Sequence, residues 1–216
     1  MEPIRRHRGE ASPPLTGRGR AVSPDGPASV YPPREDSLLL AKFAAVPAAR
    51  ARVLEIGAGT GLSSLTAARV GAAVVATDLN PFALRLLGRR AREEGLEIAL
   101  VRTDLAAGLG RFDRILANPP YLPTRPEERD PDPWHNLALD GGPDGCRVLE
   151  RLVEQLDEHL TPTGEAFVVV SSLQDEARRA EIRDGWRRRG GTVEVVDARS
   201  FEGERLEVWR FRGSAR

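Results

Sequence analysis

The sequence contains very little cysteine, and this scarcity excludes two kinds of site. Cys146 is the only cysteine among 216 residues, so neither an internal disulfide nor a cysteine-built zinc site can form within the chain. The three histidines, His7, His135 and His159, are far apart in the sequence and lack the spacing of metal ligands. We therefore expect no metal site in this chain, and the cysteine content fits a reducing compartment.

Long hydrophobic runs are absent as well. No stretch approaches the apolar length of a membrane-spanning helix, and the N-terminus lacks the hydrophobic core of a signal peptide. Net charge is also missing, because 32 Lys and Arg side chains balance 32 Asp and Glu side chains. Such a molecule has no overall field that would attract it to a polyanion or an acidic membrane. We expect a soluble protein of the cytoplasm.

The chain divides by composition into a short leader and one domain. Residues 1–29 are rich in Pro, Gly, Arg and Ser and have almost no apolar periodicity. Such a segment cannot bury enough surface to offset the entropy of ordering, so we expect a disordered leader. Residues 30–216 are long enough for one sizeable hydrophobic core and too short for two complete domains.

Apolar runs of strand length alternate with segments of helical period in the domain, which is typical of a parallel sheet with helices on both faces. The predicted strands cover residues 53–56, 73–77, 98–102, 112–117 and 166–171, and the predicted helices cover residues 62–69, 81–93, 144–160 and 174–188. Apolar residues at three- and four-residue steps in the helix 144–160, including Val148, predict a core-facing stripe. Residues 192–196 and 206–211 are joined by a loop too short for a crossover helix, so they should pair antiparallel. We predict an α/β fold of seven strands with an antiparallel C-terminal hairpin.

A glycine-rich turn follows the first predicted strand. Residues 55–61 read EIGAGTG, and glycine at alternate positions, Gly57, Gly59 and Gly61, permits positive φ angles and a close approach of the backbone to a ligand. The dinucleotide fingerprint would place its third glycine at Leu62 instead. The turn therefore favours a nucleoside without a pyrophosphate over a nicotinamide cofactor.

Carboxylates at the ends of the next two strands support a nucleoside site. Asp78, followed by Leu79, lies about twenty residues beyond the glycines, where a ribose-binding carboxylate is expected. Asp104 could accept the exocyclic amine of adenine, and the backbone N–H of Leu105 could donate to a ring nitrogen. The alternative is that both aspartates only cap the segments that follow them. Their coincidence with the glycine turn favours the nucleoside.

The fourth predicted strand ends in the tetrapeptide Asn118, Pro119, Pro120 and Tyr121. The prolines fix φ and remove two donors, which leaves the Asn118 side-chain oxygen and the Pro119 carbonyl as acceptors for the two hydrogens of a planar –NH₂ group. Tyr121 offers an apolar face on which a flat amide or base can stack. This arrangement predicts an acceptor site for an amide or amino nitrogen; the alternative is a proline turn that merely ends a strand.

These motifs, together with residues 138–145 (ALDGGPDG), resemble the HemK-type protein-glutamine N5-methyltransferases. The resemblance extends from about residue 29 to the C-terminus. It implies a class I, Rossmann-like methyltransferase that uses S-adenosyl-L-methionine to methylate the glutamine of the Gly-Gly-Gln loop in a peptide-chain release factor. It also implies that Asn118, Pro119, Pro120 and Tyr121 hold the glutamine amide. The residues that it implies at the cofactor are Ser37, Glu55, Gly57, Gly59, Gly61, Asp78, Leu79, Asp104, Leu105 and Asn118.

Residues 30–39 (VYPPREDSLL) are similar to a segment of the archaeal and eukaryotic branch of this family. The bacterial branch carries a helical domain before the catalytic one, for which the polar leader here is too short. The resemblance to the archaeal and eukaryotic branch implies a small zinc-binding partner that activates the enzyme by adding a strand to the sheet edge. We expect the apolar strand at residues 98–102 to be that edge, unless its own Glu97 and Arg102 shield it.

Two other functions fit the same motifs. The tetrapeptide at residues 118–121 could hold the exocyclic amine of a flipped nucleic-acid base, although zero net charge argues against nucleic acid. Arginines on the predicted helix 81–93 and at residues 187–189 leave that alternative open. The third possibility is a non-catalytic scaffold that binds a nucleoside and stabilises a partner, against which the intact tetrapeptide argues.

Overall fold

A computed structural model describes residues 30–45, 50–201 and 203–214. The predicted leader, residues 1–29, lies outside these described residues. No helix in the part of the chain that the structure describes combines the length and apolarity needed to cross a bilayer.

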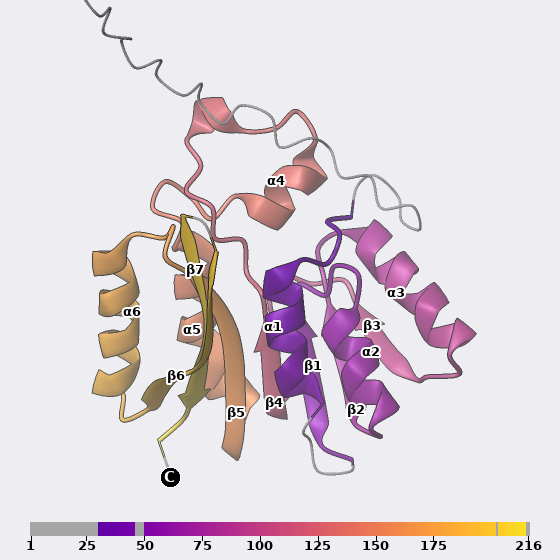
Figure 1. Ribbon diagram of the computed structural model, residues 1–216. Coiled ribbons are helices and arrows are strands. Elements are labelled where there is room, and N and C mark those ends of the chain that lie inside the picture. The colour runs from indigo at the N-terminus through magenta and orange to yellow at the C-terminus, as the bar shows by residue number, and fades with distance from the viewer. Residues whose placement is uncertain (1–29, 46–49, 202, 215–216) are drawn as a thin grey trace, which may run out of the picture.

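The described residues contain a seven-stranded sheet in the order β3-β2-β1-β4-β5-β7-β6 (Figure 1). Strands β1 to β5 pair in parallel, and β7 pairs antiparallel with both β5 and β6. This confirms the predicted fold and its antiparallel C-terminal hairpin. The strands are β1 (Arg52–Ile56), β2 (Ala73–Thr77), β3 (Ile98–Val101), β4 (Phe112–Ala117), β5 (Leu160–Ser171), β6 (Thr192–Phe201) and β7 (Glu204–Arg212).

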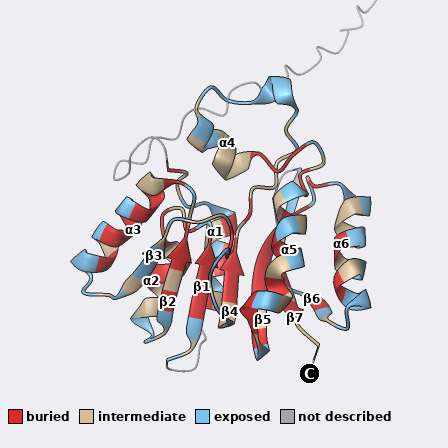
Figure 2. Cartoon of the chain, turned by 180° about the vertical axis from the view of Figure 1, so that it is seen from behind, coloured by how far each residue is buried: buried red, intermediate tan, exposed pale blue. Residues whose placement is uncertain are grey.

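Helices lie on both faces of the sheet (Figures 1 and 2). The helices are α1 (Glu35–Ala44), α2 (Leu62–Arg69), α3 (Pro81–Glu93), α4 (Pro133–Leu139), α5 (Arg147–His159) and α6 (Glu176–Arg188), with a short 3-10 turn, η1 (Pro126–Glu128). α1 and α2 pack together on one face, and α5 and α6 contact each other on the opposite face. α4 covers neither face, because it lies beyond the carboxyl ends of the parallel strands (Figure 1).

The core divides into two large clusters because side chains alternate along each strand. Val53 and Phe167 belong to a cluster with Leu39 and Leu40 of α1. Their neighbours Leu54 and Val168 belong to the other cluster, which contains the apolar stripe of α5. The sheet is therefore buried on both faces at its centre, which explains why its central strands read as nearly continuous apolar runs.

The structure differs from the prediction in the bounds of two helices, in the greater length of strands β5, β6 and β7, and in two additional helices. α5 begins at Arg147 instead of residue 144, because Gly145 has a positive φ of 75° and Asp144 Oδ1 accepts the backbone N–H of Cys146 in a turn. α6 begins at Glu176, with Asp175 as its N-cap, so residue 174 precedes the helix. The helices α1 and α4 were not predicted.

Trp186 of α6 joins the end of the sheet to the α5 side of the core. It is 1% exposed, and its Nε1 donates to the carbonyls of Thr192 and Arg212, each at 3.1 Å. We expect Trp186→Ala to lower the free energy of unfolding by about 3–5 kcal/mol, because it leaves a cavity and removes the hydrogen bonds to two carbonyls. Urea unfolding measures this change. Leu38→Ala is the control; Leu38 is 60% exposed, and its replacement should change stability by less than about 0.5 kcal/mol. Equal effects of the two substitutions would contradict this account of the core.

Candidate functional site

The parallel register of three strands determines where the candidate site lies. Ile56, the last residue of β1, pairs with Thr77 on one side and with Ala117 on the other. The residues that follow, Gly57, Asp78 and Asn118, therefore leave the sheet at the same level. The glycine turn, the predicted ribose carboxylate and the predicted acceptor residue are neighbours in space although they are up to 61 residues apart in sequence.

A cavity of about 500 Å³ opens at this edge of the sheet. Its volume is typical of sites for small molecules. The predicted site residues that line it are Ser37, Glu55, Gly57, Gly59, Asp78, Leu79, Asp104, Leu105, Asn118, Pro119, Pro120 and Tyr121. Gly61 is not among its lining residues. A Cβ at Gly61 would lie 2.3 Å from Cδ1 of Leu87, and its φ is 80°, so this glycine is required for the packing of α2 against α3.

The glycine turn presents its backbone to the cavity. Gly57 and Gly59 have φ angles of 71° and 52°, which side-chain-bearing residues rarely adopt. The backbone N–H groups of Gly57 and Ala58 both donate to the Thr77 carbonyl at 2.9 Å, which fixes the start of the turn against β2. The turn then leads into α2, whose N-terminus faces the same end of the sheet.

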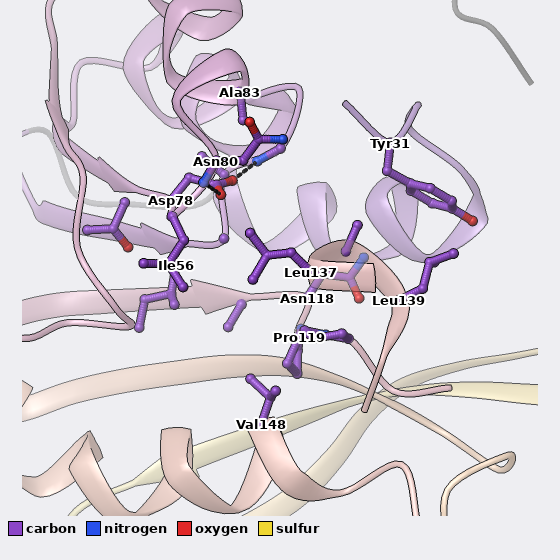
Figure 3. Close-up of a pocket in the computed structure, with 18 of the residues that line it drawn as sticks. Tyr31, Ile56, Asp78, Asn80, Ala83, Asn118, Pro119, Leu137, Leu139 and Val148 are labelled. Atoms are coloured by element: carbon purple, nitrogen blue, oxygen red, sulfur yellow. Dashed lines mark hydrogen bonds between the residues drawn. The ribbon is translucent and has the colours of Figure 1, made fainter. Parts of the chain in front are cut away.

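Two carboxylates accept hydrogen bonds from the glycine turn and from the segments next to it. Asp78 accepts the N–H of Gly59 at 2.9 Å and the N–H of Asn80 at 2.8 Å (Figure 3 shows Asp78 beside Asn80). Burial raises the pKa of Asp78 despite these bonds. Glu55 is 5% exposed and accepts the Ser64 N–H at 2.8 Å and the Ser64 hydroxyl. Burial is the largest influence on Glu55 and raises its pKa to about 7.

Asp104 is already ion-paired. Its Oδ2 lies 2.5 Å from Nη2 of Arg151 on α5, and each side chain is about half exposed, at 46% and 47%. Arg151 also lines the cavity. The next residue, Leu105, has a positive φ of 51°, and its carbonyl accepts the Thr77 hydroxyl at 2.9 Å. The carboxylate predicted to accept adenine is thus oriented by an arginine that the sequence did not suggest.

The side-chain oxygen of Asn118 is a buried acceptor without a partner. Among the described residues, Oδ1 of Asn118 is the one side-chain oxygen that is buried and makes no hydrogen bond. Leaving such a group unpaired costs about 1–3 kcal/mol. Figure 3 shows the Asn118 side chain in the cavity near Leu137 and Leu139 of α4, with Asp78 across the same space. A ligand N–H group that reached this oxygen would supply the missing hydrogen bond.

Tyr121 connects the tetrapeptide to α1. Its hydroxyl donates to Oδ2 of Asp36 at 3.3 Å, and Asp36 Oδ1 accepts the backbone N–H of Ser37 at 2.6 Å. Burial is the main cause that raises the pKa of Tyr121 well above its ordinary value, so this hydroxyl stays protonated. The ring packs partly against the α1 side of the core and also lines the cavity. Asp36 is therefore a residue of the site that was not predicted to be one.

The wall formed by α4 and α5 was also missed. It includes Trp134, Leu137 and Leu139 of α4, and Val148 of α5 (Figure 3). Val148 packs against the core, as its place in the apolar stripe predicted, and it also lines the cavity. The signal for α4 was present: Asp132 is an N-cap whose side chain accepts the Trp134 N–H, and Pro133 occupies the first turn.

Comparisons with known proteins agree with this geometry. A family model described as "Methyltransferase small domain" matches residues 35–137. The chain is 42% identical over 149 residues to a putative protein N5-glutamine methyltransferase of Methanocaldococcus jannaschii, an alignment that covers 68% of this chain and 75% of that protein. It is 35% identical over 216 residues to methyltransferase HEMK2 of Mus musculus, covering 93% and 96%. Several bacterial relatives are longer, and the chain spans about half their length.

A solved structure extends the similarity to three dimensions. The Mtq2–Trm112 complex of E. cuniculi, described as responsible for the methylation of the translation termination factor eRF1, has a chain that matches with a TM-score of 0.67 and 26% identity. The match covers 86% of this chain and 99% of that one.

The buried carboxyl of Glu55 makes stability depend on pH. Its folded pKa of about 7 lies above the ordinary value of 4.5, so the folded state favours the protonated form. The free energy of unfolding is therefore highest with respect to this group below about pH 4.5, and this stability is lost as the pH rises through about 7. Across that range we expect the wild type to lose on the order of 3–4 kcal/mol of stability relative to Glu55→Gln.

Urea unfolding of both proteins at a series of pH values measures the difference. Glu94→Gln is the matched control, because Glu94 is exposed and its hydrogen bond with Arg69 lowers its pKa. The control should follow the wild-type slope at neutral pH. A constant difference between wild type and Glu55→Gln at all pH values would contradict the prediction.

Proposed function

We propose that this chain, which belongs to the HemK family of protein N5-glutamine methyltransferases, transfers a methyl group from S-adenosyl-L-methionine to the side-chain amide nitrogen of a glutamine in the Gly-Gly-Gln loop of a peptide-chain release factor. The observation that carries the proposal is the unpartnered oxygen of Asn118, which lies in the same cavity as the glycine turn and Asp78. The described action of the E. cuniculi complex on a termination factor supports the substrate class.

The residues of the glycine-turn end fit the cofactor. Gly57 and Gly59 expose backbone next to the cavity, and Asp78 offers its carboxylate to the ribose hydroxyls. Asp104, held by Arg151, would accept the adenine amine, with Ser37, Glu55, Leu79 and Leu105 completing the wall. When bound, the cofactor supplies an electrophilic methyl group on a sulfonium.

The other end of the cavity, formed by the tetrapeptide at residues 118–121, is the acceptor end. Its residues can compensate for the weak nucleophilicity of an amide. The lone pair of an amide nitrogen is delocalised into its carbonyl, so the protein must orient the nitrogen and increase its electron density. Asn118 Oδ1 would accept one amide hydrogen and the Pro119 carbonyl the other. Tyr121, fixed by Asp36, would limit the plane in which the amide lies. Most of the rate enhancement then comes from positioning, without a side-chain base.

A methyl-transfer assay tests the proposal. With labelled cofactor, we expect the purified release factor to be labelled when its loop reads Gly-Gly-Gln and to remain unlabelled when it reads Gly-Gly-Asn. Asn118→Ala should lower kcat/KM by roughly 10²–10³ because it removes an acceptor that orients the nucleophile. Cofactor affinity, measured by calorimetry, should fall much less than kcat/KM in that variant. Equal labelling of both loops would disprove the glutamine assignment.

We also propose that a small zinc-binding partner adds a strand to β3. β3 is an edge of the sheet, and Ala99 and Leu100 are exposed on it. Arg102 does not shield the free edge of β3, because its Nε donates to the carbonyl of Leu79, which follows β2, at 3.0 Å. An exposed apolar edge strand favours strand addition. The pairing of Mtq2 with Trm112 in the E. cuniculi complex supports this partner class.

The partner proposal predicts that activity depends on β3. The counterpart of Trm112 from the same organism should raise methyl transfer by the wild type. Ala99→Glu should weaken that stimulation by about tenfold or more, because it places a charge on the contact strand. Co-purification and activity titrations measure both effects, and Glu127→Ala on η1 is a control on a distant surface. Full activity of the isolated chain with no binding would disprove the proposal.

A further inference from the structure

Asp140 lies where the segments around the acceptor end of the cavity meet. It belongs to the motif at residues 138–145, to which the proposed chemistry gives no role. Its side chain is only 6% exposed, and two arginines lie next to its carboxylate. Oδ2 accepts a hydrogen bond from Nε of Arg129 at 3.0 Å, and Oδ1 lies 3.1 Å from Nη2 of Arg147. Oδ1 also accepts the Gly142 N–H at 2.8 Å.

The backbone at Asp140 is hydrogen-bonded to the segment that follows the tetrapeptide. Leu122, the residue after Tyr121, forms a parallel bridge with Asp140. The Leu122 N–H donates to the Leu139 carbonyl at 3.0 Å, and the Gly141 N–H donates to the Leu122 carbonyl at 2.9 Å. The carbonyl of Asp140 itself accepts Nη2 of Arg147 at 3.0 Å. One residue therefore connects the tetrapeptide, the end of α4 and the start of α5.

The segment that Asp140 secures forms the roof of the acceptor end. We call residues 129–139 the roof segment; it contains α4, which lies above the carboxyl ends of the strands (Figure 1). Leu137 and Leu139 of this segment flank Asn118 in the cavity (Figure 3). Arg129, at the start of the roof segment, and Asp140, just after its end, are joined by their side chains. The ion pair thus closes the roof segment into a loop.

The carboxylate charge of Asp140 explains why its contacts with Arg129 and Arg147 matter for the structure. A buried carboxylate is stable only with hydrogen bonds and opposite charges, and loss of its partners is costly. Burial alone would raise the pKa of Asp140, but the Gly142 N–H and the guanidinium groups of Arg147 and Arg129 lower it below its ordinary value. Both arginines are about half exposed, at 49% and 45%, and both line the cavity. Asp140 thus fixes two cationic side chains at the cavity wall.

We infer that Asp140 is a positioning residue for the acceptor: through Arg129 and Arg147 it holds the roof segment over Asn118, and so it forms the binding site for the polypeptide that carries the amide. This inference rests on the proposed function. The cofactor end is built from other residues, the glycine turn, Asp78 and Asp104. Asp140 should therefore affect binding of the acceptor protein without affecting binding of the cofactor.

The test compares Asp140→Asn with the wild-type chain. We expect the KM for the release factor to rise by about tenfold or more, while kcat at saturating acceptor and the Kd for S-adenosyl-L-methionine stay within about twofold. Hydrogen exchange of residues 133–139 should become faster, and exchange of α2 should not change. Asp184→Asn is the matched control, because Asp184 is an exposed partner of Arg187 on α6, at 3.2 Å. It should leave the KM, kcat, the cofactor Kd and both exchange rates unchanged.

Two further variants protect the test from a general loss of folding. Arg129→Ala removes one half-exposed partner and should produce part of the KM effect. In the Asp140→Asn background it should add little, because both changes break the same contact. An unchanged KM in Asp140→Asn, or a parallel rise in KM and cofactor Kd, would overturn the inference.

Failure of the proposed function gives a different result. If the wild-type chain does not label a release factor, the proposed substrate is wrong. Hydrogen exchange then still decides whether Asp140 holds the roof segment, because it needs no acceptor. Unchanged exchange in residues 133–139 of Asp140→Asn would overturn the inference on that measurement alone.

Discussion

The parallel pairing of β1 with β2 and β4 is the constraint on which the rest of the structure depends. Because Ile56 is in register with both Thr77 and Ala117, the three chains emerge from the sheet together. A shift of one residue in either pair would turn the side chains of that strand to the opposite face and move its end away from the others. The two large apolar clusters on opposite faces of the sheet make such a shift costly.

The site that this register creates destabilises the folded state. Glu55 and Asp78 are carboxylates whose pKa values burial raises, and Asn118 has a buried oxygen without a partner. Each of these features opposes folding. Such features are typical of functional sites, where stability is given up for binding.

The two ends of the cavity are built differently. The cofactor end consists of tight turns whose hydrogen bonds run to neighbouring strands, as between Gly59 and Asp78. The acceptor end is closed by the roof segment, which is short and joined to the sheet through Leu122 and Asp140. A segment outside the sheet can vary without changing the register of the strands.

The sequence by itself determined the positions of the strands and the central helices, and all but one of the predicted site residues line the cavity. These features depend on local periodicity and on motifs at strand ends. The order of the strands made Gly57, Asp78 and Asn118 neighbours, and that order follows from rules for parallel sheets. Only the tertiary structure decided the rest. Gly61 serves packing against Leu87, and Arg151 orients Asp104. The roof segment owes its place to contacts of Asp140, which couple residues with no common periodicity, so no local pattern in the sequence could reveal them.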